Sequence, residues 1–254
     1  SLYFDIAGTG ITYEYKNYDQ KYYIPTLSAA PIVFREGNST LASRNSHTIN
    51  WGDEVGHQIE LNSSIGDFQM MGNFSFAYKH KQDGDETLYP FGFAGYQYPF
   101  RQLYSEISGY TLNDKFYFKL GIDQFDEFKL KGESNEGTSA LTFPSMSTFD
   151  IGGGNSITSY IEYQNRDYSL RDEDLVLTRL DNYKARYISL TYNYVNFLSF
   201  SIFYDDEQFE KKVFDIVWDE GINIWRGYDI TAKVNSTSQF SVFYGSQKGG
   251  LVCA

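Results

Sequence analysis

Three histidines, His47, His57 and His80, are the residues of this sequence best suited to acid–base chemistry near neutral pH. Hydrolysis through a serine nucleophile needs a histidine beside a hydroxyl group. Only His47 meets that condition, because it lies in Asn45-Ser46-His47-Thr48. No recognised nucleophile motif surrounds it. We therefore expect His47 to be structural and the chain to carry no catalytic residues.

Acidic residues gather at three places where their oxygen atoms could bind Ca²⁺. They are Asp83-Gly84-Asp85-Glu86, Arg171-Asp172-Glu173-Asp174 and Asp205-Asp206-Glu207. None matches an EF-hand loop, and clustered acids in a solvated loop need no ligand. The histidines lack paired metal-site spacing, and the single cysteine, Cys253, excludes a cysteine-based zinc site. We therefore predict neither a metal nor a cofactor.

Composition favours β structure for the elements that carry these residues. Tyr (23), Phe (21) and Trp (3) make up 19% of 254 residues, and aromatic side chains suit pleated, half-buried surfaces. A formal net charge of −12 argues against nucleic acid as a partner. No run of 18 uncharged apolar residues occurs, which excludes a transmembrane helix. A transmembrane barrel stays possible, because its apolar and polar residues alternate.

Apolar and polar residues alternate with period two along most of the chain, which is typical of strands. In 68–78, for example, Phe74 and Phe76 share one face while Asn73 and Ser75 share the other. The pattern predicts eleven strands in one domain spanning residues 1–254. Their ranges are 2–16, 57–65, 68–80, 99–111, 115–125, 141–151, 155–166, 185–195, 198–208, 225–235 and 238–246.

The connections between these strands alternate between short and long. Turns rich in Gly, Asn and Asp are expected at 65–67, 112–115, 152–155, 195–197 and 235–237. Long polar segments are expected at 17–56, 81–98, 126–140, 167–184 and 209–225. Bacterial outer-membrane barrels have short periplasmic turns and long extracellular loops. The rhythm therefore predicts an antiparallel up-and-down transmembrane β-barrel; a soluble β-sandwich and a propeller are the alternatives.

The two faces of the predicted strands differ in polarity. In a membrane barrel the aromatic face meets lipid and the polar face lines the interior, whereas in a soluble barrel the polar face meets solvent. An arginine replacing Phe74 or Leu190 should therefore damage a membrane barrel more than a replacement of Asn73 or Thr191. The polar face includes Lys119, Asp123, Glu162, Gln164, Asn193 and Lys233.

Two of the long segments are too rich in aromatic residues to be simple solvated loops. Exposed aromatic loops are good partner-binding surfaces, and packing as a lid is the alternative. The first segment could also enter the barrel interior. The candidate partner-contact residues are Tyr22, Tyr23, Phe34, Trp51, Tyr89, Phe91, Phe93 and Tyr96.

Two stretches carry a family resemblance. They are Ala30-Pro-Ile-Val-Phe-Arg-Glu-Gly-Asn-Ser-Thr-Leu-Ala-Ser-Arg-Asn-Ser-His-Thr48 and Ser241-Val-Phe-Tyr-Gly-Ser-Gln-Lys-Gly-Gly-Leu-Val-Cys-Ala254. They resemble a family of Bacteroidota outer-membrane β-barrel proteins of unassigned function. In that family a second cysteine and further strand follow the Gly-Gly-x-x-Cys stretch. The resemblance implies an outer-membrane location and a place in envelope assemblies for secretion or nutrient uptake, and it brings no catalytic residues.

Three functional hypotheses follow from these patterns. The first is a non-enzymatic barrel that acts as a structural or accessory subunit of an envelope complex. Its partners would be the lipid bilayer, lipopolysaccharide and other outer-membrane or periplasmic proteins, not nucleic acid. The second is a porin-like channel for small solutes, and the third is a hydrolase with His47 at the barrel rim.

The strand count raises the question of completeness. Single-chain bacterial barrels have an even number of strands with both ends on the periplasmic side. Eleven strands ending outside break both conditions, so we expect the chain to be a segment of a larger barrel, with at least one further strand after Ala254 and others before Ser1. Cys253 would then pair with a cysteine in the continuation.

Overall fold

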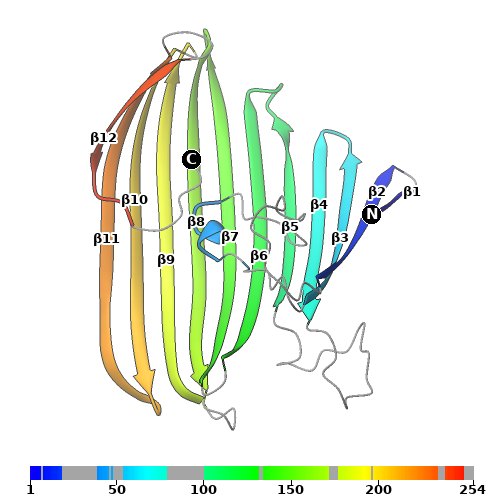
Figure 1. Ribbon diagram of the computed structural model, residues 1–254. Coiled ribbons are helices and arrows are strands. Elements are labelled where there is room, and N and C mark those ends of the chain that lie inside the picture. The colour runs from blue at the N-terminus through cyan, green and yellow to red at the C-terminus, as the bar shows by residue number, and fades with distance from the viewer. Residues whose placement is uncertain are drawn as a thin grey trace.

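The computed structural model places the strands of this chain in one antiparallel sheet. It describes residues 1–6, 8–18, 39–45, 47, 54–78, 100–131, 134–171, 177–195, 197–233 and 238–248. Twelve strands are present within these ranges, and each pairs with its neighbours in chain order from β1 to β12 (Figure 1). The predicted all-β, antiparallel up-and-down fold is confirmed. No helix within the same ranges is long and apolar enough to cross a membrane.

The strands lengthen from β1, with 5 residues, towards the middle of the sheet, and the last strand, β12, has only 7. The longest, β7, has 19 residues. The elements are β1 (Leu2–Ile6), β2 (Thr9–Tyr18), η1 (Ala42–Arg44), β3 (Glu54–Ile65), β4 (Phe68–Tyr78), β5 (Phe100–Thr111), β6 (Phe116–Lys131), β7 (Ser134–Gly152), β8 (Asn155–Arg171), β9 (Leu177–Tyr194), β10 (Leu198–Val213), β11 (Ile216–Lys233) and β12 (Gln239–Gly245).

The predicted strand 2–16 is wrong, because it is a hairpin of two strands. β1 and β2 pair from Leu2↔Tyr13 to Ile6↔Thr9. Gly8 has a φ of +80°, which glycine adopts without steric penalty, and its N–H donates to Asp5 Oδ1 at 3.4 Å. The described part of the chain therefore holds twelve strands rather than the predicted eleven. Every predicted strand from 57–65 onward overlaps one observed strand.

Three of the five predicted long segments, 126–140, 167–184 and 209–225, are also wrong, because they lie mostly in strands. β6–β7, β8–β9 and β10–β11 pair through most of these residues, and only 132–133, 172–176 and 214–215 separate the strands. Charged and polar side chains interrupt the apolar face of these strand ends, even where apolar residues such as Ile222 and Ile224 remain exposed on it. Apolar alternation is therefore lost, although the ladder of backbone hydrogen bonds continues. We call this end of the sheet the hairpin end.

The opposite end of the sheet has the short turns that the sequence predicts, and we call it the short-turn end. Turns occupy 66–67, 112–115 and 153–154. Positive φ angles at Gly66 (+60°) and Asn113 (+55°) explain the choice of glycine and asparagine there. The predicted turn at 235–237 lies outside the described residues.

The two faces of the sheet differ as expected, with large apolar side chains exposed on the outward face. Near the short-turn end, neighbouring strands expose Leu190, Ile202 and Ile230 by 45%, 49% and 43%. On the inward face, Thr191 and Ser201 form a hydrogen bond of 2.8 Å between the same strands. The predicted division into an apolar face and a polar face is therefore confirmed.

A small apolar cluster interrupts the polar inward face. It consists of Ala77, Phe100, Phe125 and Ala140, from four consecutive strands β4–β7, and all four side chains are buried. The ring of Phe125 meets that of Phe100 edge-on, with 5.6 Å between ring centroids. This cluster forms part of the floor beneath the segment described next.

Candidate functional site

A segment that follows β2 lies against the inward face of the sheet. We call residues 39–45 and 47 the inward segment. Its short helix η1 lies in front of β7 and β8 in Figure 1. Leu41 is completely buried there and Ala42 nearly so. Entry into the interior is one of the positions expected for the first aromatic segment, and residues 39–45 and 47 of it lie there.

One carboxylate of β8 holds the start of the inward segment. The backbone N–H groups of Thr40 and Leu41 donate to Glu162 Oε1 and Oε2 at 2.9 and 2.7 Å. Gln164, two residues further along the same face, donates from Nε2 to the Leu41 carbonyl and to Thr142 Oγ1 at 2.9 and 2.8 Å. The two bonds to the Glu162 carboxylate are charge-assisted, and such hydrogen bonds are about twice as strong as neutral ones. The predicted inward positions of Glu162 and Gln164 are therefore confirmed.

The middle of the inward segment is tied to β10 by an ion pair. Arg44 Nη2 lies 2.5 Å from Asp205 Oδ2, and the two side chains are only 15% and 4% exposed. The buried Arg44 Nη1 and Asp205 Oδ1 have no hydrogen-bond partner among the described residues. The pair is therefore joined by one hydrogen bond rather than by two.

The end of the inward segment is clamped by His47 between two carboxylates. Its Nδ1 lies 2.9 Å from Glu127 Oε1 of β6, and its Nε2 lies 3.2 Å from Glu54 of β3. The imidazole stacks on Phe100, with 4.2 Å between ring centroids. Burial by itself would lower the pKa of His47, but the hydrogen bonds and charges of Glu127 and Glu54 outweigh it and raise the pKa. This geometry favours the imidazolium, which donates to both carboxylates.

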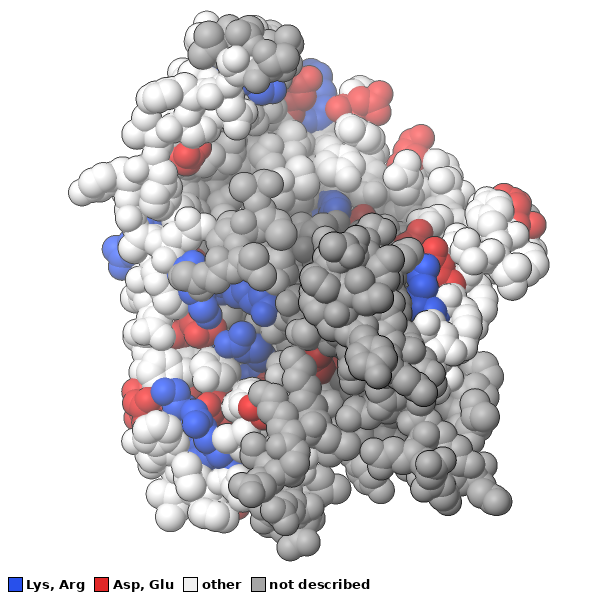
Figure 2. Space-filling view, viewed as in Figure 1, with Lys and Arg blue, Asp and Glu red and all other residues white. Residues whose placement is uncertain are grey.

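These attachments require the sheet to curve round the inward segment. Strands lie about 4.8 Å apart, so a flat sheet would hold β3 and β10 roughly 34 Å apart. Arg44 and His47 are three residues apart, and their backbone spans at most about 11 Å. They nevertheless reach β10 and β3. The inward face is therefore the concave face of the sheet, and Figure 2 shows basic and acidic side chains interleaved on it.

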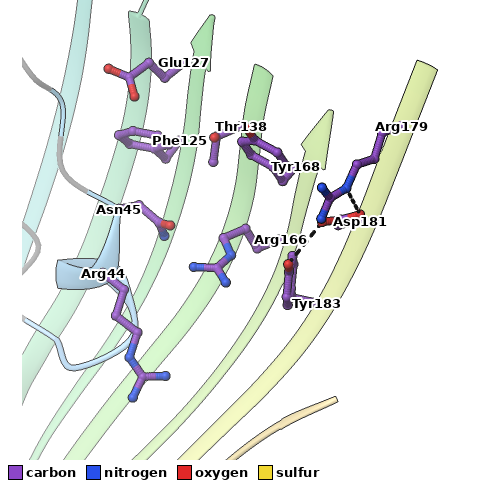
Figure 3. Close-up of a pocket in the computed structure, with 10 residues that line it drawn as sticks. All are labelled: Arg44, Asn45, Phe125, Glu127, Thr138, Arg166, Tyr168, Arg179, Asp181 and Tyr183. Atoms are coloured by element: carbon purple, nitrogen blue, oxygen red, sulfur yellow. Dashed lines mark hydrogen bonds and ion pairs between the residues drawn. The ribbon is translucent and has the colours of Figure 1, made fainter. Parts of the chain in front are cut away.

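A pocket of about 520 Å³ lies beside the inward segment, towards the hairpin end (Figure 3). Arg166 lies over the ring of Tyr183, 4.6 Å from its centroid. Arg179 donates from Nε and Nη2 to the two oxygens of Asp181 at 2.9 and 2.6 Å. The lining consists of Arg44, Asn45, Phe125, Glu127, Thr138, Arg166, Tyr168, Arg179, Asp181 and Tyr183.

The histidines lie in different surroundings. His57 is on the outward face, where Nδ1 lies 2.8 Å from the Tyr13 hydroxyl and the ring stacks on Phe76. It therefore lies on the opposite face of the sheet from His47, which stacks on the inward Phe100. His80 lies outside the described residues.

The acidic run 205–207 is held by basic side chains. Asp205 pairs with Arg44, and Asp206 with Arg186 at 2.5 Å. Glu207 lies 3.2 Å from Arg166 and 2.5 Å from Lys248. No group of three or more His, Cys, Asp or Glu residues suited to a metal is found in the described part of the chain. The acids of 83–86 and 172–174 lie outside it.

The predicted partner-contact residues Tyr22, Tyr23, Phe34, Trp51, Tyr89, Phe91, Phe93 and Tyr96, and Cys253, also lie outside the described residues. Sequence reasoning did not single out Arg44, Arg166 or Arg179. A usable signal existed for Arg166, which shares the inward alternation of Glu162 and Gln164 on β8. No such signal placed Arg44 against β10.

Comparisons with known proteins give one structural likeness. No protein-family model matches the chain, and no curated protein sequence matches it. A solved structure of OmpT, an outer membrane protein of Vibrio cholerae folded in vitro and in its trimer form, is similar at 12% identity. The match covers 76% of this chain and 80% of that chain, with a TM-score of 0.34. The assignment of the fold therefore depends on the order and register of the strands, not on this likeness.

Proposed function

We propose that this protein is a non-enzymatic outer-membrane protein of the β-barrel type that forms a porin-like channel for small polar solutes. The apolar outward face supports a place in the bilayer, because the exposed side chains of Leu190 and Ile202 would contact lipid there instead of water. The polar inward face supports a hydrated interior. In the Gram-negative envelope that the family resemblance implies, the bilayer and lipopolysaccharide are its surroundings.

One observation carries the proposal, namely the inward segment that narrows the concave side. It is fixed by Glu162 of β8, Asp205 of β10 and two carboxylates around His47. Side chains of β3, β6, β8 and β10 therefore hold one short piece of chain across a polar interior. Such a segment limits what passes, and its charged neighbours determine which solutes are favoured.

The two other hypotheses have less support. The accessory-subunit hypothesis depended on aromatic loops that lie outside the described residues. The hydrolase hypothesis needs His47 to act as a base towards a hydroxyl group. Both ring nitrogens of His47 instead meet carboxylates, which suits a structural imidazolium. We therefore place the channel first and propose no catalytic residue.

Conductance across planar lipid bilayers tests the channel. The purified chain should insert and give stepwise currents. Glu162→Ala should give larger steps, because the Thr40 and Leu41 amides lose their acceptor and the inward segment is released. Glu210→Ala is the matched control, since Glu210 is an exposed acid of β10 paired with Lys212. Absence of stepwise current from both the folded wild type and Glu162→Ala would overturn the channel.

A further inference from the structure

The pocket beside the inward segment brings together three guanidinium groups from three separate elements. Arg44 comes from η1, Arg166 from β8 and Arg179 from β9. Figure 3 shows Tyr168 and Tyr183 between Arg166 and Arg179, and Arg44 on the other side of Arg166. Arg44 is over 120 residues away in sequence from the other two, so only the inward folding of its segment completes the set.

These arginines keep donor capacity beyond their contacts within the protein. A guanidinium has five N–H donors. Arg179 gives Nε and Nη2 to Asp181, and Arg166 gives Nη2 to Glu207 at 3.2 Å. Arg44 gives Nη2 to Asp205, while its buried Nη1 has no hydrogen-bond partner among the described residues. A buried donor of this kind calls for an acceptor, and an oxyanion supplies two or three.

The acids of the pocket lining are already matched by cations. Glu127 meets His47, and Asp181 is bound by both ends of the Arg179 fork. Beside the pocket, Glu207 is shared by Arg166 and Lys248. Among the lining residues themselves, three arginines face two carboxylates, Glu127 and Asp181, which leaves one positive charge in excess for a ligand.

The surroundings of Lys248, which follows β12, point to the same positive potential. Burial lowers the pKa of Lys248, and the charges of Arg44 and Arg166 lower it further, although Glu207 acts in the opposite direction. Lys248 therefore lies within electrostatic reach of two of the three pocket arginines.

Size and aromatic lining indicate the kind of anion. A volume of about 520 Å³ lies within the roughly 300–1,000 Å³ range of small-molecule sites. Tyr168, Tyr183 and Phe125 offer flat faces beside the arginines, and Asn45 and Thr138 offer neutral hydrogen-bonding groups. This combination suits a ring or short chain that carries hydroxyl groups and one oxyanion.

We propose that this pocket is a binding site for small organic oxyanions of sugar size, carrying a carboxylate or a phosphate. The proposal rests on the proposed channel function and deepens it by naming the solute class. Arg44, Arg166 and Arg179 bind the oxyanion, and Tyr168 and Tyr183 contact the body of the solute. Because Arg44 belongs to the inward segment, the site exists only while that segment is seated.

Equilibrium binding to the detergent-solubilised full chain tests the proposal with three probes that share one skeleton. They are glucose, gluconate and glucose 6-phosphate, compared at low ionic strength by calorimetry. Gluconate or glucose 6-phosphate should bind at least about tenfold more tightly than glucose. The anion that binds better distinguishes a carboxylate site from a phosphate site. Added salt should weaken binding of the anion. Equal binding of glucose and both anions, or no binding of any probe, would overturn the proposal.

Variants locate the site. Arg166→Gln and Arg179→Gln should each weaken anion binding about tenfold or more, because each removes a charged fork from the pocket. Arg101→Gln is the matched control, since Arg101 is a half-exposed arginine of β5 paired with Asp126. Anion binding that survives both pocket substitutions would overturn the proposal. If a pocket variant fails to fold, the binding of glucose, gluconate and glucose 6-phosphate to the wild type alone decides whether the site exists.

The binding and conductance experiments separate the two proposals. Anion binding without bilayer current overturns the channel and supports the site. Bilayer current with equal passage and equal binding of glucose and gluconate overturns the site and supports the channel.

Discussion

Arg44 and Asp205 illustrate how single residues attach the inward segment. Breaking a buried ion pair from one side leaves an uncompensated charge, whereas replacing both partners by apolar residues is often neutral. We expect Asp205→Leu to lower the free energy of unfolding by about 3 kcal/mol. The double variant Arg44→Met/Asp205→Leu should recover most of that loss. Chemical denaturation in detergent measures both values.

The double variant is also the control for loss of packing, because methionine has nearly the volume of arginine, and leucine leaves no cavity at the position of Asp205. Equal destabilisation of the single and double variants would show that the charge of Arg44 is not the cause. The inward segment should then be regarded as held by Glu162, Gln164 and the contacts of His47 with Glu54 and Glu127.

His47 makes the attachment dependent on pH. Its pKa is raised above the ordinary value of 6.5, because the hydrogen bonds and charges of Glu127 and Glu54 outweigh its burial. A histidine whose pKa is raised on folding contributes stability that is fully present below pH about 6.5. That stability is lost as the pH rises through the pKa of the folded state. We therefore expect the inward segment to be protected from proteolysis at pH 6. It should be cleaved faster as the pH rises through the raised pKa of His47.

His47→Gln serves as the control, because glutamine cannot carry the charge that Glu54 and Glu127 face. The variant should lose the His47-dependent part of the pH profile. A wild-type profile in which protection increases with pH would contradict the assignment of His47 as an imidazolium.

At the scale of elements, the β10–β11 hairpin contains a turn in which Phe214 does not suit its backbone conformation. Phe214 and Asp215 have φ angles of +46° and +64°, and a non-glycine residue in this region is strained by about 1 kcal/mol or more. Asparagine tolerates this conformation better than phenylalanine. Phe214→Asn should therefore raise the free energy of unfolding by about 1 kcal/mol.

Phe214→Ala is the comparison for this prediction, because it removes the ring but keeps a side chain that disfavours positive φ. It should give no gain in the same denaturation experiment. A gain from alanine equal to that from asparagine would assign the effect to the exposed ring, which is 69% accessible, rather than to the backbone.

The elements also show what the sequence could predict. Alternation located the strands where one face is apolar, as at Leu190 and Ile202. It failed at 126–140, 167–184 and 209–225, because charged and polar side chains interrupt the apolar face there. Pairing continues through backbone bonds and contacts such as Lys211–Asp219 at 2.7 Å. It also merged β1 with β2, because Asp5 and Gly8 interrupt the pattern too briefly.

The candidate site was only partly predictable. The inward positions of Glu162 and Gln164 follow from strand alternation, which is local. Their contacts with Leu41 join residues more than 120 positions apart. The periodicity of one sequence reports only local structure and carries no information about contacts between distant residues. The pairing of Arg44 with Asp205 could therefore not be predicted.

At the scale of the whole molecule, one sheet separates two environments. Exposed apolar residues such as Leu190 and Ile202 lie in a band on the outward face towards the short-turn end. Charged outward residues such as Arg186 and Asp206 lie nearer the hairpin end, where Ile222 and Ile224 of β11 are also exposed. Within the described strands, β1 and β12 have one hydrogen-bonded neighbour each. The outward band is therefore the surface on which a bilayer position can be tested.

Leu190 and Thr191 of β9 give that test on adjacent residues of opposite faces. Leu190 is 45% exposed on the outward face, whereas Thr191 faces inward and bonds to Ser201. Arginine at a lipid-facing midplane position costs about 2–4 kcal/mol, so Leu190→Arg should destabilise the folded protein in phospholipid vesicles by about that amount. Thr191→Arg should be milder, because its side chain reaches the polar interior.

Thr191 is a better control than Asn73, the other inward residue that the alternation indicates. Asn73 is only 2% exposed, and its Nδ2 has no hydrogen-bond partner among the described residues. Equal losses from Leu190→Arg and Thr191→Arg in vesicle unfolding experiments would mean that both faces are packed, and the bilayer position of this sheet would be wrong.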